Sequence, residues 1–465
     1  MELLHHGAVT GVTGSCHELR LTQKQAILID CGLFQGENNG NETAQPIDFL
    51  HPGIQALIVT HAHIDHIGRI PYLLEAGFNC PIYCSAATAA LMPIMLEDAI
   101  KIGLTREVLV IRRLLLRLQR LLRPVSYQHW TAITAIPGLA FRLIPAGHIL
   151  GSAGIEVHYS SAHVESGTAK PTRRVVFSGD IGCRDSPLLG DPQSPDYADI
   201  LVLESTYGDR LHEGRSQRQQ QLQAIVERCL RDQGTILIPA FAVGRTQELL
   251  YELEAIIAAF QQHQLSGASS MSWQDIAIIL DSPLALRVTE AYDDWQHWWD
   301  TEARQRVRQG RHPLDFSQLH LIPDHHRHQA TVAYLKRTSA PCIVIAGSGM
   351  CTGGRIVNYL QALLPDKRTD VLFVGYQAHG TLGRELQQQP AQVTIGNKAI
   401  KVAATIHTLH GYSAHADQQG LLDYVAGMKH LPGEIRLVHG DAEAKKMLAQ
   451  KLREHFSVQV TLPTA

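Results

Sequence analysis

The stretch that decides the fold is His61-Ala62-His63-Ile64-Asp65-His66, which directly follows the apolar run Ala56–Thr60. The two histidines of an extended His-x-His pair point their imidazoles roughly the same way, and a turn then brings a carboxylate and a third imidazole beside them. Imidazole and carboxylate together suit zinc or a similar divalent ion. We therefore predict a metal site after a strand. The alternative, a polar loop in which histidines cluster by chance, is disfavoured by partner residues elsewhere in the chain.

Short apolar runs rich in β-branched residues recur along the chain and predict buried strands. Helical patterns lie between several of them, at about 216–231, about 246–261 and from about 442 onward. This alternation predicts layered α/β domains. The predicted strands are Ala26–Asp30, Ala56–Thr60, Phe141–Pro145, Arg174–Ser178, Ile200–Leu203, Thr235–Pro239, Ile276–Leu280, Cys342–Ala346, Val371–Val374 and Ile435–Val438.

Polar side chains lie at or just after the ends of seven of these runs. Because ligands of layered α/β folds gather at the carboxyl ends of strands, we expect these side chains to form one site. They are Asp30, His61, His148, Asp180, Glu204, Asp281 and His439.

Length and composition exclude several classes of protein. A chain of 465 residues with 45% apolar residues has room for two or three globular domains. No apolar stretch reaches the roughly 18 residues of a membrane span, so we expect no membrane partner. The net charge of −3 does not indicate a nucleic-acid binder. Eight scattered cysteines suggest the reducing cytoplasm, and we interpret Cys80 and Cys84 as ordinary thiols and not as half a zinc site.

The chain resembles the metallo-β-lactamase fold over nearly its whole length. The resemblance rests on the stretch quoted above, on His148 in a Gly-His-Ile-Leu-Gly segment, and on Asp180 in Ser-Gly-Asp-Ile-Gly. It implies two Zn²⁺ ions per chain. One would bind His61, His63 and His148, and the other Asp65, His66 and His439, with Asp180 bridging both. Asp30 would orient a ligand.

About 200 residues separate Glu204 from the next motif of the fold, and this insertion resembles the β-CASP branch. Glu204, His415 in Gly-Tyr-Ser-Ala-His-Ala-Asp, and His439 match the three accessory motifs of that branch. The resemblance implies an αββα sandwich, formed by about 1–208 and 390–465, with an α/β cap at about 209–389. We expect catalytic roles for Asp65, Glu204, His415 and Asp30.

Four further stretches, at 239–248, 281–285, 347–355 and 375–384, also look like this branch. Most are rich in glycine and each follows a predicted strand, so exposed backbone N–H groups and arginines could meet phosphate oxygens. A single loop of this kind could equally be a simple turn. Together they predict RNA contacts at Arg245, Ser348, Arg355, His379 and Arg384.

The resemblance extends to bacterial and archaeal RNA nucleases related to the eukaryotic mRNA 3′-end processing endonuclease. RNA-specific members carry His at the third accessory motif, as at His439, whereas DNA-repair members carry Val. We therefore expect a zinc-dependent ribonuclease that cuts single-stranded RNA and leaves 5′-phosphate and 3′-hydroxyl ends. The sequence favours endonuclease action without excluding an exonuclease, and it leaves the choice between monomer and homodimer open.

Two other functions compete with this interpretation. A small-molecule ester or thioester hydrolase has no need of Glu204 and His415. A non-catalytic RNA-processing scaffold would have lost metal ligands, and all seven are present here.

Three segments lie outside the predicted site. Arg106–Arg123 is interpreted as a surface helix with one buried stripe, with a basic helix along RNA as the alternative. The tryptophans at 295, 298 and 299 are expected to pack, and the histidines at 325, 326 and 328 to lie in a solvated loop.

Overall fold

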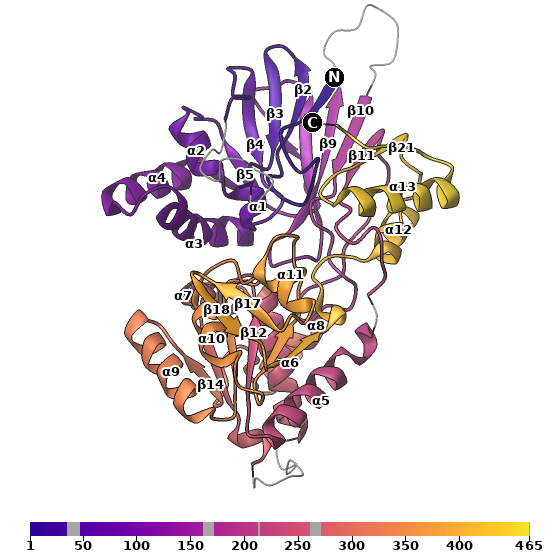
Figure 1. Cartoon of the computed structure of the whole chain (residues 1–465). Coiled ribbons are helices and arrows are strands. Elements are labelled where there is room, and N and C mark those ends of the chain that lie inside the picture. The colour runs from indigo at the N-terminus through magenta and orange to yellow at the C-terminus, as the bar shows by residue number, and fades with distance from the viewer. Residues whose placement is uncertain (35–46, 161–171, 213, 261–270, 465) are drawn as a thin grey trace, which may run out of the picture. The chain divides into compact units, whose positions relative to one another are not determined.

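The computed structural model describes residues 1–34, 47–160, 172–212, 214–260 and 271–464. These residues form two compact units. The first comprises 1–211 together with 415–465, and the second comprises 212–414. The first unit is therefore split in sequence by the second, as Figure 1 shows by colour.

The first unit contains two sheets. The first has the order β1-β2-β3-β4-β5-β6 and the second has the order β21-β20-β11-β10-β9-β8-β7. The strands of the first sheet are β1 (Glu2–His5), β2 (His17–Thr22), β3 (Gln25–Ile29), β4 (Ile54–Ile58), β5 (Ile82–Ser85) and β6 (Leu122–Val125). Those of the second are β7 (Thr131–Ala132), β8 (Leu139–Pro145), β9 (Ala153–Ser160), β10 (Thr172–Phe177), β11 (Ile200–Leu203), β20 (Glu434–Leu437) and β21 (Gln459–Thr461).

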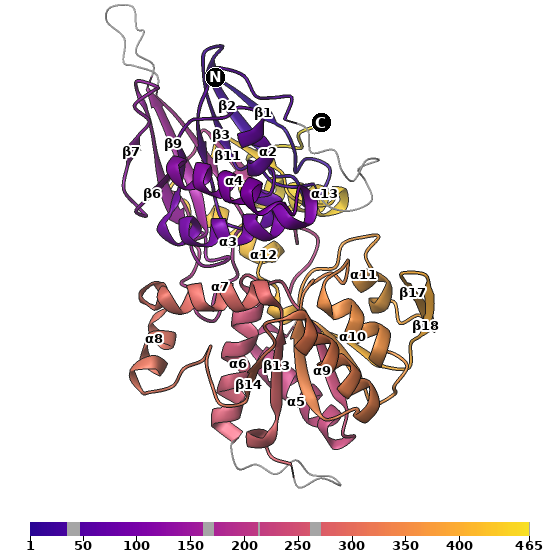
Figure 2. The same ribbon diagram turned by 90° about the vertical axis from the view of Figure 1, so that its left-hand side faces the viewer.

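The two sheets pack face to face, with helices outside them. Ile27, Ile58 and Phe141 belong to one buried cluster that joins the sheets. A second cluster packs Leu201 and Ile435 of the second sheet against two C-terminal helices. Four layers, αββα, result, which confirms the predicted fold class (Figure 2). The helices are α1 (Ile64–Ile67), α2 (Ile70–Glu75), α3 (Ala86–Gly103), α4 (Val108–Leu121), α12 (Gln418–Ala426) and α13 (Ala442–Phe456).

The second unit is built around a parallel sheet with the order β14-β13-β15-β12-β16-β19. Its strands are β12 (Thr235–Pro239), β13 (Ala277–Asp281), β14 (Leu319–Leu321), β15 (Cys342–Ala346), β16 (Asp370–Phe373) and β19 (Thr405–Thr408), and β17 (Gln392–Ile395) and β18 (Lys398–Lys401) form a hairpin. Its α-helices are α5 (Arg218–Arg231), α6 (Arg245–Phe260), α7 (Pro283–Asp294), α8 (Thr301–Arg308), α9 (His325–Thr338), α10 (Arg355–Leu363) and α11 (Leu382–Gln387). Short 3₁₀ turns occur at Arg215–Gln217, Trp273–Asp275, Gln296–Trp298 and His410–Tyr412.

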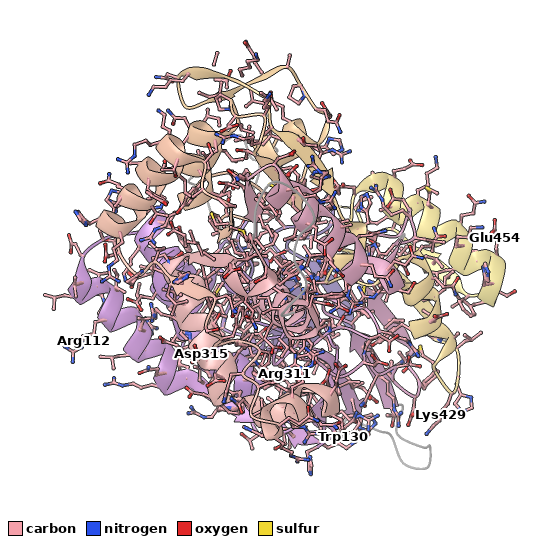
Figure 3. The ribbon with its side chains drawn as sticks, turned by 90° about the horizontal axis from the view of Figure 1, so that it is seen from below. Arg112, Trp130, Arg311, Asp315, Lys429 and Glu454 are labelled. Carbon is pink, nitrogen blue, oxygen red and sulfur yellow. The ribbon has the colours of Figure 1, made fainter. Side chains whose placement is uncertain are left out.

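The second unit extends further than the cap at 209–389 that we expected. Its boundary lies at Ala414 because β19 pairs in parallel with β16 and so completes the second sheet. Side chains on the surface of both units extend outward in Figure 3, for example Arg112 of α4 and Glu454 of α13. Among the helices that the structure describes, none combines the length and the apolar character that crossing a membrane requires.

Candidate metal centre

All seven predicted metal ligands lie in the first unit, five in loops that follow strands and two, Asp65 and His66, in the short helix α1. The strand β4 ends at Ile58, and His63 then caps the N-terminus of α1, whose first turn carries Asp65 and His66. The backbone of Gly32 passes so close behind this turn that a Cβ there would lie 1.5 Å from the carbonyl oxygen of Asp65. His61 also follows β4. His148 follows β8, Asp180 follows β10 and His439 follows β20.

One group of ligand atoms consists of His61, His63, His148 and Asp180. The Nδ1 atom of His63 lies 3.1 Å from Nε2 of His61 and 3.1 Å from Nε2 of His148. The Oδ2 atom of Asp180 lies 3.5 Å from both of those Nε2 atoms. Ligands placed tetrahedrally around zinc at its usual bond lengths are about 3.3 Å apart, so this group has the spacing of a zinc site.

A second group consists of Asp65, His66, His439 and, again, Asp180. The Nε2 atom of His66 lies 3.3 Å from Oδ1 of Asp180 and 3.3 Å from Nε2 of His439. That same atom of His439 lies 3.3 Å from Oδ2 of Asp65. Asp180 thus faces the first group with Oδ2 and the second group with Oδ1, which is the arrangement of a bridging carboxylate.

Asp180 provides a test of whether the residues fit metal ions. Its side chain is 1% exposed, yet within the described part of the chain neither carboxylate oxygen has a hydrogen-bond partner. A buried carboxylate without hydrogen bonds is costly and calls for an unseen ion or water. Two cations, one at each oxygen, would satisfy it, so the residues fit a centre of two metal ions.

Hydrogen bonds on the side away from the centre fix the protons of two histidines, His61 and His66. The hydroxyl of Thr60 donates to Asp30 and therefore accepts from Nδ1 of His61, at 3.0 Å. Asp30 Oδ2 accepts from Nδ1 of His66 at 2.8 Å. In each ring a protonated Nδ1 leaves a lone pair on Nε2, the atom that faces the centre.

A third histidine, His439, is contacted by the hydroxyl of Thr206, and its Nδ1 also lies 3.5 Å from Oδ1 of Asp180. That hydroxyl donates to the backbone carbonyl of His439 at 3.2 Å and accepts from Nδ1 at 3.1 Å. Thr60 and Thr206 were not among the predicted site residues. The sequence offers one weak signal for them, because each threonine lies within two residues of a predicted site residue.

Two site residues adopt left-handed backbone conformations that non-glycine residues rarely take. Asp30 has φ 60° and His439 has φ 51°. Each is held by its neighbours, since Asp30 receives hydrogen bonds from the amide and hydroxyl of Thr60, and the amide of His439 donates to the carbonyl of Ala8 at 2.7 Å. Such strain persists where the surroundings over-determine a functional position.

Glu204 and His415 form a pair beside the bridging aspartate. Nδ1 of His415 lies 3.2 Å from Oε2 of Glu204 and 3.9 Å from Oδ2 of Asp180. The backbone amides of Ile181 and Thr206 both donate to the Glu204 carboxylate and fix its position. This contact directs the Nε2 atom of His415 away from the carboxylate.

Burial and neighbouring charges set the protonation of these groups in the metal-free chain. Burial lowers the pKa of His61 well below its usual value, which keeps the ring neutral, as a metal ligand must be. Burial also lowers the pKa of His66, but Asp180, Asp30 and Asp65 outweigh it and raise the pKa well above the usual value. For His415, burial again acts downward, and Glu204 with Asp180 raises the pKa to about 9.

Asp281 does not belong with the other strand-end residues, and our expectation of a seven-residue site was wrong for it. It lies at the end of β13 in the second unit and is fully buried. Its carboxylate accepts from Nη1 of Arg355 at 2.6 Å and from the hydroxyl of Tyr359, and lies 2.7 Å from Nδ1 of His328.

The prediction of a solvated loop at residues 325, 326 and 328 was wrong about the loop, and wrong about solvation for His328, whereas His325 and His326 are exposed. These histidines form the first turn of α9, and His328 is buried with its second ring nitrogen 2.8 Å from Nδ2 of Asn358. The error arose because Asp281, the carboxylate partner of His328, lies 47 residues earlier in the sequence. Trp299 is buried as expected, whereas Trp295 and Trp298 are half-buried.

The five candidate RNA contacts all lie in the second unit but differ in accessibility. Arg245 is only 4% exposed and pairs with Glu248, and Arg355 is held by Asp281, so both guanidinium groups have internal partners. Arg384 and Ser348 are half-buried and His379 is exposed. The last three are therefore the better placed to meet a ligand.

An αββα sandwich with two clusters of His and Asp at its strand ends, joined by one buried carboxylate, defines a metallo-hydrolase. Comparison with known families agrees. A model described as the metallo-beta-lactamase superfamily matches residues 9–240, and one described as the Beta-Casp domain matches 246–386. A third, the Zn-dependent metallo-hydrolase RNA specificity domain, matches 399–463.

Among curated proteins, the chain is 37% identical over 449 residues to Ribonuclease TTHA0252 of Thermus thermophilus, which covers 97% of this chain and 95% of the relative. It is 30% identical over 473 residues to Transcription termination factor FttA of Methanocaldococcus jannaschii, covering 98% and 69%. The factor of the same name from Methanosarcina mazei is 29% identical, covering 97% and 69%. The chain belongs to the β-CASP branch of the metallo-β-lactamase superfamily and is a metal-dependent hydrolase.

Proposed function

We propose that this protein hydrolyses phosphodiester bonds in single-stranded RNA with two zinc ions. The observation that carries the proposal is the position of Asp180, which belongs to both metal-ligand groups and also lies beside Glu204 and His415. An acid–imidazole pair beside the metal ligands suits phosphodiester hydrolysis, because the leaving oxygen must receive a proton.

The ligand groups described above assign the metals. His61, His63 and His148 would hold one ion, and Asp65, His66 and His439 the other, with Asp180 shared. When bound, the ions would act as Lewis acids toward the phosphate and lower the pKa of a water toward neutrality.

The chain's own residues would move the protons. Asp65 would accept a proton from the attacking water, and water can reach its side chain, which is 24% exposed. Glu204 holds a proton on the ring of His415, whose Nε2 would donate to the leaving 3′-oxygen. Attack by water leaves the ribose 2′-hydroxyl out of the reaction, so the products would carry 5′-phosphate and 3′-hydroxyl ends.

Three findings support RNA as the substrate. One relative is named a ribonuclease, the C-terminal family model is described as an RNA specificity domain, and the third accessory motif carries His439. We propose endonuclease action, in the cytoplasm, where all eight cysteines would stay reduced. Arg384, Ser348 and His379 are the proposed RNA contacts.

The test uses circular single-stranded RNA and circular DNA of the same sequence, each incubated with the zinc-loaded protein. We expect the RNA circle to be opened, with product ends mapped as 5′-phosphate and 3′-hydroxyl, and the DNA circle to survive. The variant His63→Ala, purified in the same way, controls for a contaminating nuclease. Equal cutting of DNA, 2′,3′-cyclic phosphate ends, or hydrolysis of a chromogenic ester in place of RNA would overturn the proposal.

A further inference from the structure

The helix α4 presents an unusual surface on the side away from the core. Ile111, Leu114 and Leu118 face inward and are buried. Of the fourteen large apolar side chains that are exposed among the described residues, five lie within 102–116. Two of them, Leu109 at 81% and Leu116 at 45% exposure, are seven residues apart and so lie on the same helix face. The other three are Ile102, Leu104 and Val108.

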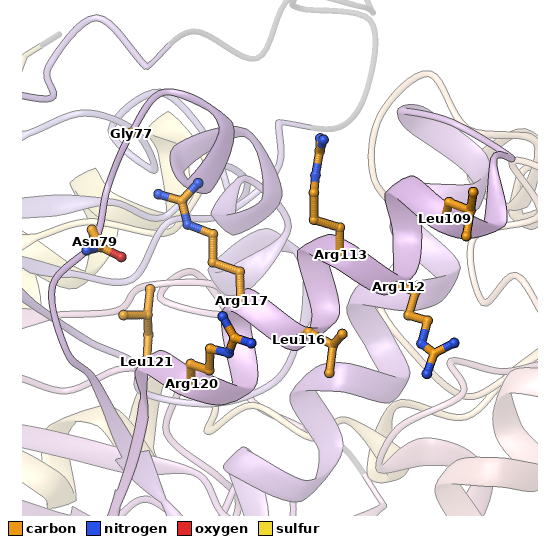
Figure 4. Close-up of a pocket in the computed structure, with 9 residues that line it drawn as sticks. All are labelled: Gly77, Asn79, Leu109, Arg112, Arg113, Leu116, Arg117, Arg120 and Leu121. Atoms are coloured by element: carbon orange, nitrogen blue, oxygen red, sulfur yellow. The ribbon is translucent and has the colours of Figure 1, made fainter.

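The same face is strongly basic. Leu109 and Leu116 line a recess of about 720 Å³ together with Arg112, Arg113, Arg117 and Arg120, and the loop at Gly77 and Asn79 forms part of its wall (Figure 4). Arg113 pairs with Glu75 at 3.2 Å and Arg117 donates to the carbonyl of Phe78. Among the described residues, no carboxylate pairs with Arg112 or Arg120. The segment 106–123 holds six arginines and a single acid, Glu107.

The combination of arginines and exposed leucines favours some binding partners of this surface over others. A second copy docked helix to helix would bring arginines against arginines and is disfavoured by repulsion. RNA would satisfy the charges and leave the leucines in water. A bilayer would take the leucines, but interfacial segments carry Trp or Tyr, and residues 101–123 contain no aromatic residue. A recess also fits a rod better than a flat membrane.

We propose that the face of α4 formed by Leu109, Arg112, Arg113, Leu116, Arg117 and Arg120 binds an acidic amphipathic helix of a partner protein. The partner's apolar stripe would cover the two leucines, and its carboxylates would meet the guanidinium groups on either side. This surface lies outside the metal centre, and the proposal does not depend on the substrate of the enzyme.

The probe is a fluorescent helical peptide of glutamate and leucine whose leucines recur at i, i+3/4 and i+7. A second peptide of identical composition has its leucines spread around the helix. Fluorescence anisotropy with the full zinc-loaded chain should show at least about tenfold tighter binding of the amphipathic peptide. Leu109→Gln/Leu116→Gln should abolish that preference, and Arg112→Glu/Arg120→Glu should weaken binding of both peptides.

The matched control is Arg308→Glu/Arg337→Glu, which changes the net charge equally at two exposed helical arginines of the second unit. It should bind as the parent does. All three variants should keep the metal content and the hydrolytic rate of the parent, which shows that they fold.

Equal binding of the two peptides would overturn the proposal, because the surface would then recognise only the charge of the peptide and not its apolar stripe. Three effects of the Leu109→Gln/Leu116→Gln variant would also overturn the proposal. They are loss of binding to vesicles of phosphatidylserine and phosphatidylcholine, lower affinity for an RNA oligonucleotide, and dissociation of a dimer in sedimentation.

Discussion

Asp30 lies 2.8 Å from Nδ1 of His66, on the side of the ring opposite to the metal centre. The same carboxylate accepts the amide and the hydroxyl of Thr60, the residue that precedes His61. One buried acid therefore sets the orientation of a ligand in each group, directly for His66 and through a hydroxyl for His61.

We expect Asp30→Asn to weaken zinc binding at the group of His66 and His439 by about 10- to 100-fold. The amide nitrogen cannot accept a hydrogen bond, so Nδ1 of His66 loses its acceptor. Competition with a chromophoric chelator measures the two affinities. Asp199→Asn is the control, since Asp199 also accepts a backbone amide, that of Arg174, but lies outside the ligand groups. Unchanged affinity at both positions would show that Asp30 does not orient the ligand.

His63→Ala should remove zinc and hydrolysis together. The Nδ1 atom of His63 lies within 3.1 Å of two other ligand nitrogens, so its loss opens the first group. Elemental analysis of the parent should give two ions per chain and fewer in the variant. Finding a single ion in fully active parent protein would contradict the two-metal centre.

His415→Gln should keep both metals and lose about 10²- to 10⁴-fold in rate, the usual contribution of a general acid. Glutamine retains a polar contact with Glu204 but cannot carry the proton. Single-turnover cleavage of labelled RNA measures the rate, and elemental analysis measures the metals. If zinc were lost as well, His415 would be a metal ligand.

Arg384→Ala should weaken RNA binding by a similar factor for all sequences and make the dependence of log affinity on log salt shallower by about one unit. Titration of labelled RNA at several salt concentrations measures both effects. Arg308→Ala, at an exposed arginine of α8, is the control. A changed sequence preference with an unchanged salt slope would indicate a base contact.

Arg245→Ala should act on stability instead. The ion pair of Arg245 with Glu248 is buried, and removing Arg245 leaves the Glu248 carboxyl with only the electrostatic attraction of Arg215 and Arg218, at a cost of up to about 3–5 kcal/mol. Denaturant unfolding measures the loss. The double variant Arg245→Met/Glu248→Leu should recover most of it, and a similar loss in the double variant would count against the pair as the cause.

The strands could be predicted because the signal for a buried strand is local. Each of the ten apolar runs corresponds to a strand, and Ile200–Leu203, Thr235–Pro239 and Cys342–Ala346 match it residue for residue. The helices predicted at about 216–231 and from about 442 also match, as α5 and α13.

What the sequence could not supply was information about partners far along the chain. Asp281 ends a strand just as Asp180 does, and nothing local tells which sheet that strand joins. The role of Thr206 depends on His439, 233 residues later. For the same reason nothing local shows that the compact second unit continues past residue 389 to Ala414, because the pairing of β19 with β16 decides to which unit residues 390–414 belong.

The pairing of β11 with β20 has a consequence for the order of folding. Leu203 pairs with Leu437, so these neighbouring strands are separated in sequence by the whole second unit. During synthesis β11 remains an unpaired edge of the sheet until residues 434–437 have left the ribosome. An unpaired edge strand of this kind is prone to aggregation. His415 and His439 also follow the second unit in the sequence. A nascent chain that has not yet reached residue 439 would therefore have an incomplete second ligand group, so the proposed hydrolysis could not begin until β20 and the residues after it had been made.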